Sequence, residues 1–237
     1  NSSREILTEM TDSLHHRGPD DAGYALWNHN DTVIGFGHRR LSVIDLSPLG
    51  HQPMTSHDDL HIIFNGEIYN YKEIREELLQ KGFHFRSNSD TEVILNAYRQ
   101  WGMDMLVKFT GMFSIVLFDA ANSKVILVRD RAGVKPLYYY WKNNLFLFAS
   151  ELKAFHKHPG FEKKINAGCV EAFLQYGYVP APDSIFLNAC KLLPGHYLVF
   201  DLNKTNFEQI KYWDVADYYS KPGISITETE ALEETER

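Results

Sequence analysis

The sequence predicts an α+β protein in which antiparallel sheets are covered by helices. Apolar strands recur at hairpin spacing: 112–119 is followed by 124–130, and 196–202 by 207–213, each time across a short polar segment. Amphipathic helices come in groups between these strands and do not alternate with them one by one. This order is typical of antiparallel sheets with packed helices, and not of a parallel βαβ array.

The first half of the chain is expected to begin with a helix and short strands. We expect a helix over 3–14, a loop over 15–23, and strands over 23–27, 32–38 and 40–47. Two later helices, over 71–82 and 91–102, carry start signals. Asn70 with Glu73, and Ser89 with Glu92, match the capping-box pattern. Gly82 is placed to end the first of these helices.

The second half is expected to consist mainly of paired strands. Besides the two hairpins, we expect strands over 136–141 and 144–150, and helices over 151–158 and 167–177. The pair Asn143-Asn144 marks the turn between the first two of these, because asparagine tolerates the left-handed conformation that tight turns need.

Composition limits the classes of protein to consider. The chain has 237 residues, of which 44% are apolar and 23% charged, and no apolar run approaches the about 18 residues that a membrane span needs. A formal charge of −7 argues against a nucleic-acid partner. Cys169 and Cys190 form no CxxC pair, and we expect them to be reduced thiols of a cytoplasmic protein. His156 and His158 are expected to lie in a solvated turn, and we expect no metal.

Asn65 and Gly66 are the first candidates for chemistry. They follow the strand-like residues 61–64, and we expect them at the end of that strand. A side-chain amide and the next peptide N–H can form an oxyanion hole, and glycine allows a substrate to approach the backbone. The alternative is an ordinary tight turn.

Charged residues nearby suggest the rest of a site. Arg39 and Arg40 are expected just before a strand, where a guanidinium can bind a carboxylate bidentately, although a surface ion pair is the alternative. Asp90 begins a helix and can receive an ammonium group, unless it serves only as a helix cap. Together with Asn65, these residues suggest a site for a zwitterionic amino acid. No GxSxG motif or nearby cysteine supplies an attacking group.

Nine motifs occur in an order that resembles a known family. They are "HRGPDDAG", "GHRRLSVIDLS", "GHQPM", "FNGEIYNY", "SDTEVIL", "GMFSIVLFD", "RDRAGVKPLYY", "ASELKAF" and "LLPGHYL". The set resembles the glutamine amidotransferase domain of glutamine-hydrolysing asparagine synthetases, from about Leu14 to Leu198. The resemblance implies an N-terminal-nucleophile hydrolase sandwich: helices, antiparallel sheet, antiparallel sheet, helices.

The resemblance also implies roles for particular residues. Arg40 resembles the α-carboxylate anchor, Asn65 and Gly66 the oxyanion hole, and Glu67 and Asp90 the contacts to the substrate amino group. The pocket is implied to be lined by Leu41, Val43 and Ile44. In this family the nucleophile is an N-terminal cysteine whose own amino group acts as base. We therefore expect the nucleophile upstream of Asn1, and we expect this chain alone to be unable to hydrolyse glutamine.

The implied domain organisation is a glutaminase domain over 1–213 and a linker over 214–237 that leads into a truncated ATP-dependent synthetase domain. Thr227 and Glu230 are expected to cap a helix there. L-glutamine is the implied partner of this chain, which is expected to hold no cofactor. ATP, magnesium and aspartate are implied for the second domain, and a homodimer remains open.

Two other readings remain. In the first, the domain supplies ammonia to another acceptor, such as a sugar or a secondary-metabolite carboxylate. Alternatively, the domain binds glutamine or a partner without catalysis, and a residue other than cysteine at the N-terminus would favour this reading.

Overall fold

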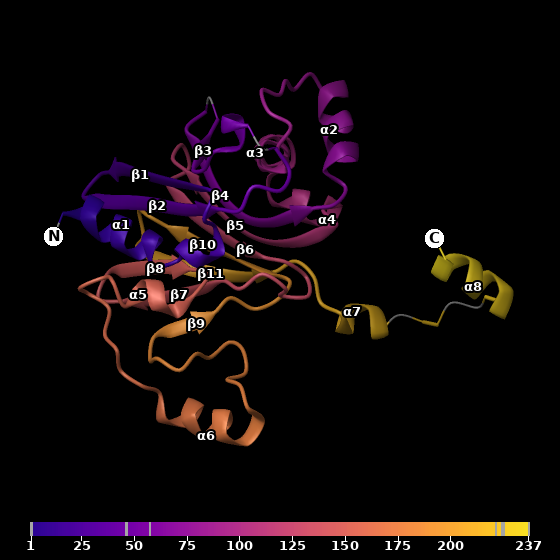
Figure 1. Ribbon diagram of the computed structural model, residues 1–237. Coiled ribbons are helices and arrows are strands. Elements are labelled where there is room, and N and C mark those ends of the chain that lie inside the picture. Colours follow the sequence, from indigo (N-terminus) through magenta and orange to yellow (C-terminus); the bar gives the residue numbers. More distant parts are fainter. Residues whose placement is uncertain (1, 46, 57, 221, 224–225, 237) are drawn as a thin grey trace.

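A six-stranded antiparallel sheet forms the centre of the computed structural model (Figure 1), which describes residues 2–45, 47–56, 58–220, 222–223 and 226–236. The strand order is β11-β10-β6-β5-β4-β3. The bounds are β3 Met54–Thr55, β4 Leu60–Ile68, β5 Gly111–Asp119, β6 Lys124–Arg129, β10 His196–Asp201 and β11 Asn206–Lys211. The hairpins predicted over 112–130 and 196–213 are therefore confirmed.

A second layer of strands packs against this sheet and is divided in two. One part is the hairpin β1-β2, and the other is the three-stranded sheet β8-β7-β9. The bounds are β1 Asp21–His29, β2 Thr32–Arg40, β7 Tyr138–Lys142, β8 Leu145–Ala149 and β9 Ala189–Lys191. The turn between β7 and β8 has positive φ at Asn143 and Asn144, as the sequence predicted.

Helices cover both outer faces (Figure 1). On the six-stranded sheet lie α2 Tyr71–Gln80, α3 Asp90–Trp101 and α4 Met105–Lys108, and on the second layer lie α1 Ser3–Asp12 and α5 Leu152–Phe155. Farther from the sandwich are α6 Ala167–Tyr176, α7 Ala216–Tyr219 and α8 Glu228–Glu236. Short 3-10 turns occupy His15–Arg17, Pro48–Gly50 and Gly102–Asp104. No helix in the described ranges is long and apolar enough to cross a membrane.

The central strand β5 explains why the layers pack in this order. Phe113, Ile115 and Leu117 point into the core beneath α2 and α3, while Val116 and Phe118 point into the core between the two sheet layers. Both faces of the strand are therefore buried, and its sequence reads as a nearly continuous apolar run. The predicted sandwich of helices, two antiparallel layers and helices is confirmed.

The predicted strand over 40–47 is wrong. The strand ends at Arg40, and residues 41–45 form none, while Leu46 lies outside the described residues. Arg40 pairs with Asp21, the first residue of β1, so the chain loses its ladder partner at this point. The two arginines consequently end a strand and do not precede one.

Other predicted boundaries and caps also differ. The first helix ends at Asp12 and not at 14, and α5 covers only four of the eight residues expected over 151–158. Asn70 is the N-cap of α2, but its side chain binds Lys108 O and Thr110 N, at 2.9 Å each, and does not cap. Ser89 caps α3 through Thr91 N at 3.1 Å.

Of the two remaining capping-box predictions, one is wrong and one is confirmed. Glu92 binds the backbone N–H groups of Arg86 and Ser87, at 2.9 and 2.7 Å, and Ser89 accepts from Thr91 and not from Glu92, so the second predicted box is wrong although Ser89 is the N-cap. Thr227 and Glu230 do form a capping box, with Thr227 N donating to Glu230 at 2.7 Å and Glu230 N to Thr227 at 3.3 Å.

Asp130 organises the loop that follows β6. This carboxylate is 1% exposed and accepts four backbone N–H groups. Ala132 and Val134 donate to Oδ1 at 3.1 and 2.9 Å, and Phe113 and Lys135 donate to Oδ2 at 3.2 and 2.9 Å. One side chain thus joins the start of β5 to the loop that leads into the second layer.

We predict that Asp130→Ala lowers the free energy of unfolding by at least about 3 kcal/mol, because each buried donor left unpaired costs about 1–3 kcal/mol. Urea unfolding of this chain measures the change. Asp201→Ala is the matched control, since Asp201 also accepts two backbone N–H groups, at 3.0 and 3.1 Å, but in an exposed hairpin turn. Equal losses in the two variants would contradict the role given to Asp130.

Candidate active site

Asn65 and Gly66 lie within a strand and not at its end. β4 continues to Ile68, with Asn65 opposite Ser114 and Gly66 opposite Phe113 on β5. The predicted strand end is therefore wrong. Gly66 has φ of +155°, and a Cβ at this position would lie 2.1 Å from the carbonyl oxygen of Met112. The glycine is required by the close approach of β5.

Beyond its short pairing with β3, the edge of β4 that does not pair with β5 faces a cavity. Alternate residues of a strand direct their backbone groups to the same edge, and on this edge lie Phe64, Gly66 and Ile68. The N–H of Phe64 donates to Gln52 Oε1 at 2.6 Å, and that of Ile68 donates to Asp90 Oδ2 at 3.2 Å. The N–H of Gly66 lies between them on the same edge and faces the cavity that Gly66 lines.

The side-chain amide of Asn65 is buried without a partner. Its Nδ2 is one of two buried side-chain polar atoms in the described part of the chain that have no hydrogen bond. Buried donors are nearly always paired, since an unpaired one costs about 1–3 kcal/mol. The amide is thus held ready to donate, beside the N–H of Gly66.

All the residues predicted to form the site line one cavity of about 580 Å³. They are Arg40, Leu41, Val43, Ile44, Asn65, Gly66, Glu67 and Asp90. The side chains of Leu41 and Val43 are 61% and 68% exposed and lie where the cavity opens to solvent. The fold therefore brings together three segments, 40–44, 65–67 and the first turn of α3.

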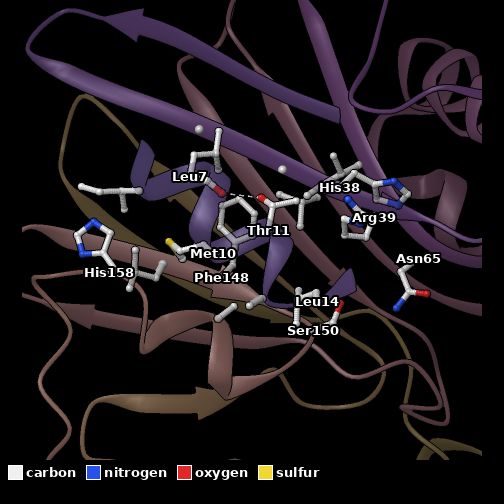
Figure 2. A pocket seen from close by; sticks show the side chains of 18 of the residues that line it. Leu7, Met10, Thr11, Leu14, His38, Arg39, Asn65, Phe148, Ser150 and His158 are labelled. Carbon is white, nitrogen blue, oxygen red and sulfur yellow. Dashed lines mark hydrogen bonds between the residues drawn. The ribbon is translucent and has the colours of Figure 1, made fainter. Parts of the chain in front are cut away.

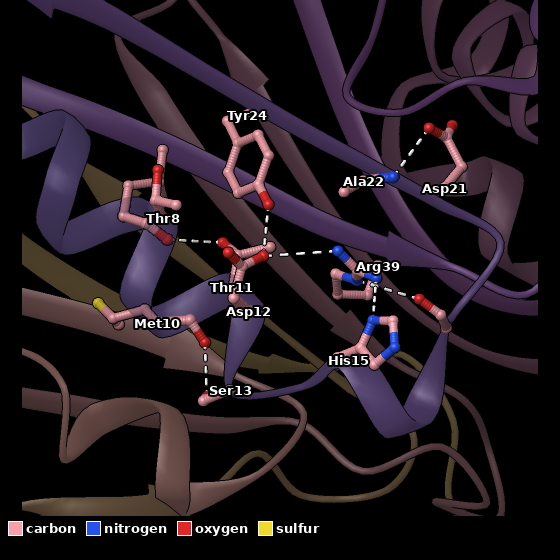
Figure 3. Close-up of polar contacts among 12 residues, drawn as sticks. Thr8, Met10, Thr11, Asp12, Ser13, His15, Asp21, Ala22, Tyr24 and Arg39 are labelled. Atoms are coloured by element: carbon pink, nitrogen blue, oxygen red, sulfur yellow. Dashed lines mark hydrogen bonds and ion pairs between the residues drawn. The ribbon is translucent and has the colours of Figure 1, made fainter.

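Arg40 and Arg39 point to opposite sides of β2. Arg40 donates to the carbonyl oxygens of Asp45 and Ser47, the latter at 3.3 Å, and these contacts hold its guanidinium at the cavity wall. Arg39 binds the end of α1 and the following turn (Figure 3): its Nε donates to Gly18 O at 3.0 Å, and it contacts Asp12 at 3.4 Å. Both arginines line the cavity, but from different sides, and Arg40 lies on the side of the loop that begins at residue 41.

Asp90 carries a perturbed carboxyl group. It is 5% exposed, and burial raises its pKa to about 6, although the N–H groups of Ile68 and Thr91 oppose the shift. The negative charge of Glu67 raises the pKa further. A cation in the cavity would favour the ionised carboxylate, so Asp90 is suited to receive one.

His38 lies on β2, two residues before Arg40, and contacts β4 next to Asn65. Its Nε2 is 3.0 Å from the carbonyl oxygen of Phe64, and its ring lines the cavity wall. Burial lowers its pKa to about 4, an effect that the bond to Phe64 opposes and the charge of Arg40 reinforces. The imidazole is therefore neutral at physiological pH.

A second cavity, of about 350 Å³, adjoins the first (Figure 2). It runs between β2 and β8 beneath α1, and Asn65, His38 and Arg39 lie at one end of it. The two strands that border it, β2 and β8, each pair with one neighbour only, so their facing edges are without strand partners among the described residues. The groove is mostly apolar, with Leu7, Met10 and Phe148 on its walls.

Neither cavity is lined by a cysteine among the described residues. Cys169 is buried on α6 and Cys190 lies on β9, and both are free thiols. Burial raises the pKa of each. A nucleophilic cysteine usually has a lowered pKa instead.

Two of the nine motifs, in which no residue was predicted to have a chemical role, contact each other in the structure. Glu151 accepts from His16 at 3.0 Å and Arg17 at 3.1 Å, and pairs with Lys153 at 3.3 Å. "HRGPDDAG" and "ASELKAF" are thus joined at the second layer. Sequence reasoning also missed Gln52 and His38, because their side chains bind a residue distant in the chain and no local pattern indicates such a contact.

The arrangement can bind a zwitterion and stabilise an anion. Arg40 supplies positive charge, and Glu67 and Asp90 supply negative charge elsewhere on the cavity wall. Between these charges lie two donors, the N–H of Gly66 and Asn65 Nδ2, the latter without a hydrogen-bond partner among the described residues. In the described residues no group of three or more His, Cys, Asp or Glu side chains is placed to hold a metal ion.

Comparison with solved structures shows the class of fold. The chain matches glutamine PRPP amidotransferase from B. subtilis with a TM-score of 0.64 and 17% identity, covering 90% of this chain and 47% of that one. At this identity the likeness concerns the fold alone. That fold is the class II, N-terminal-nucleophile amidotransferase sandwich. Residues 1–213 match the family model described as a glutamine amidotransferase domain, and the chain belongs to this family.

Curated relatives agree with the motifs. A protein of Methanocaldococcus jannaschii named putative asparagine synthetase [glutamine-hydrolyzing] 2 is 39% identical over 232 residues, covering 91% of this chain and 44% of the relative. Asparagine synthetase [glutamine-hydrolyzing] 2 of Bacillus subtilis (strain 168) is 37% identical over 224 residues, covering 92% of this chain and 29% of the relative. The chain spans less than half the length of these relatives, and the predicted resemblance is confirmed.

We predict that Asp90→Asn stabilises the fold at neutral pH. Because the folded pKa of about 6 exceeds the unfolded value of about 3.9, the stability that the protonated carboxyl contributes is complete below about pH 4 and is lost as pH rises through 6. The variant should be about 1–3 kcal/mol more stable than the parent at pH 7.5, since one pKa unit is about 1.36 kcal/mol, and no more stable near pH 4. Urea unfolding at both pH values measures this. A difference that does not vary with pH would contradict the shift.

Proposed function

We propose that this domain hydrolyses L-glutamine to glutamate and ammonia, within a longer protein that uses the ammonia to convert aspartate to asparagine. The observation that carries the proposal is the buried Nδ2 of Asn65, which has no partner among the described residues, beside the N–H of Gly66 at the cavity. Two such donors stabilise the oxyanion that forms when a nucleophile attacks the γ-carboxamide carbon of glutamine.

The charges of the cavity suit the backbone of an amino-acid substrate. Arg40 binds the α-carboxylate, and Asp90 and Glu67 receive the α-ammonium. Leu41, Val43 and Ile44 line the cavity. This placement directs the substrate side chain toward Asn65.

The nucleophile in this proposal is an N-terminal cysteine that precedes Asn1, on a strand that fills the groove between β2 and β8. Three observations support it. The groove has an unpaired strand edge on each side, its walls are apolar, and Asn65 lies at one end of it. The thiolate would form a thioester as the carbon–nitrogen bond breaks and ammonia leaves with an added proton, and water would then release glutamate.

The acceptor and its cofactors belong to the rest of the longer protein. The names of the relatives support aspartate as the acceptor. In this proposal residues 1–213 form the glutaminase domain, residues 214–237 lead into the ATP-dependent domain, and ATP and magnesium bind there and not in this chain. The longer protein is proposed to work in the cytoplasm.

We predict that Asn65→Ala in the full-length protein uncouples glutamine use from synthesis. Loss of one oxyanion donor lowers kcat by about 100- to 1,000-fold, and glutamine KM changes little because the donor acts chiefly on the transition state. Ammonia-dependent asparagine formation should remain near the parent value, since free ammonia bypasses this site. Both rates and a melting curve are measured on one preparation. A parallel loss of both rates with a lower Tm would mean that Asn65 only supports the fold.

We also predict that Arg40→Lys raises glutamine KM by at least tenfold. A lysine ammonium cannot reproduce a bidentate grip on a carboxylate, and the loss is about 1.5–3 kcal/mol, the range for charged hydrogen bonds. Arg39→Lys serves as the matched variant, because the guanidinium of Arg39 already binds Asp12 and the carbonyl oxygen of Gly18. If KM rises only in the Arg39 variant, the carboxylate anchor is Arg39.

A further inference from the structure

Phe64, the residue before Asn65, has both backbone polar groups bound by side chains. Its N–H donates to Gln52 Oε1 at 2.6 Å, and its carbonyl oxygen lies 3.0 Å from His38 Nε2. Phe64 itself is 6% exposed, and Gln52 is equally buried. Gln52 therefore holds the peptide between Ile63 and Phe64, and His38 holds the next one, between Phe64 and Asn65.

These side chains stand where a neighbouring strand would otherwise be. β3 pairs with β4 only through Met54 and Thr55, opposite Ile62 and His61. The next residue of β4 on that edge is Phe64, which the same register would place opposite Gln52, where β3 no longer extends. Gln52 and His38 supply the missing acceptor and donor.

The chemistry of the contact determines the state of His38. The acceptor is a carbonyl oxygen, so Nε2 must carry a hydrogen in either charge state. Burial and the nearby charge of Arg40 keep the ring neutral, although Asp21 opposes them, and His51 acts in the same direction as Arg40. His38 thus acts as a hydrogen-bond donor to the backbone and not as a general base.

Gln52 also connects β4 to the first turn of α3. Its Nε2 donates to Thr91 Oγ1 at 3.3 Å, and Thr91 follows Asp90 in the first turn of α3. Asp90 in turn accepts the N–H of Ile68 at 3.2 Å. The segment from Phe64 to Ile68 is therefore tied at both ends to the first turn of α3, with Asn65 between the ties.

We propose that His38 and Gln52 are positioning residues that fix the two peptides on either side of Phe64, and with them the direction of the oxyanion donors. Neither residue needs to touch the substrate for this role. The proposal rests on the proposed function, since it assigns no chemistry apart from that of Asn65 and Gly66. A displacement of about 1 Å at a reacting group can cost about 100-fold in rate, so such a clamp has a measurable effect.

The test uses the full-length protein with His38→Leu, His38→Gln and a matched control, His61→Leu. His61 is also a buried histidine of the sheet, but its ring binds Thr55 at 2.9 Å, away from the cavity. His38→Leu should lower the glutaminase kcat by about 10- to 100-fold with KM within twofold. His38→Gln retains an N–H donor and should recover to within about threefold of the parent. His61→Leu should lower Tm but leave kcat unchanged.

A double variant separates positioning from general damage. If His38 acts through Asn65, adding His38→Leu to Asn65→Ala should lower kcat by less than about threefold more, because the two effects are not additive. Additive losses would overturn the proposal, as would equal losses in His38→Leu and His38→Gln. If His38→Leu does not fold, Gln52→Met and Gln52→Glu replace the pair, since only Glu keeps an acceptor for the N–H of Phe64.

The two proposals can fail separately. If Asn65→Ala loses glutaminase activity while His38→Leu retains the parent kcat, the positioning role is wrong and the oxyanion role stands. If Asn65→Ala itself retains the parent kcat, the proposed function fails at its central observation, and the positioning role fails with it.

Discussion

Burial of the central sheet on both faces is the constraint on which the rest of this structure depends. β5 directs Ile115 toward the helices and Val116 toward the second strand layer, and the ladder between β4 and β5 pairs one edge of each strand. In so apolar a setting every backbone polar group needs a partner. Where a strand partner ends, side chains must therefore take its place, and this happens along the edge of β4.

The candidate site arises from that replacement. Gln52 and Asp90 bind the N–H groups of Phe64 and Ile68, and the N–H of Gly66 between them faces the cavity. The unpaired amide of Asn65 lies beside it. A sheet that otherwise leaves few donors free thus presents two at one point. The same burial raises the pKa of Asp90, so the carboxyl is poised to ionise when a cation enters.

Much of the fold could be predicted from local patterns, because hairpins and amphipathic helices depend on residues close in sequence. The hairpins around β5 and β10, and the cap of α3 by Ser89, are of this kind. The errors occur where a distant segment competes for a residue. Asn70 is placed as a helix cap, but its amide binds the chain just before β5. The stretch after Arg40 has strand-like composition, but no partner strand remains beside it.

The sequence by itself determined the class of fold, the family, and which residue types are available for a site. Alternation of apolar residues, turn residues and the spacing of nine motifs carry that information locally. Only the tertiary structure decided that Asn65 and Gly66 lie inside a strand, that Arg40 and not Arg39 lies on the loop side of the cavity, and that His38 and Gln52 bind the backbone of Phe64, the residue before Asn65. The physical reason is that these facts depend on hydrogen bonds between segments distant in the chain. Such bonds exist only when the sheet layers and α3 have packed together.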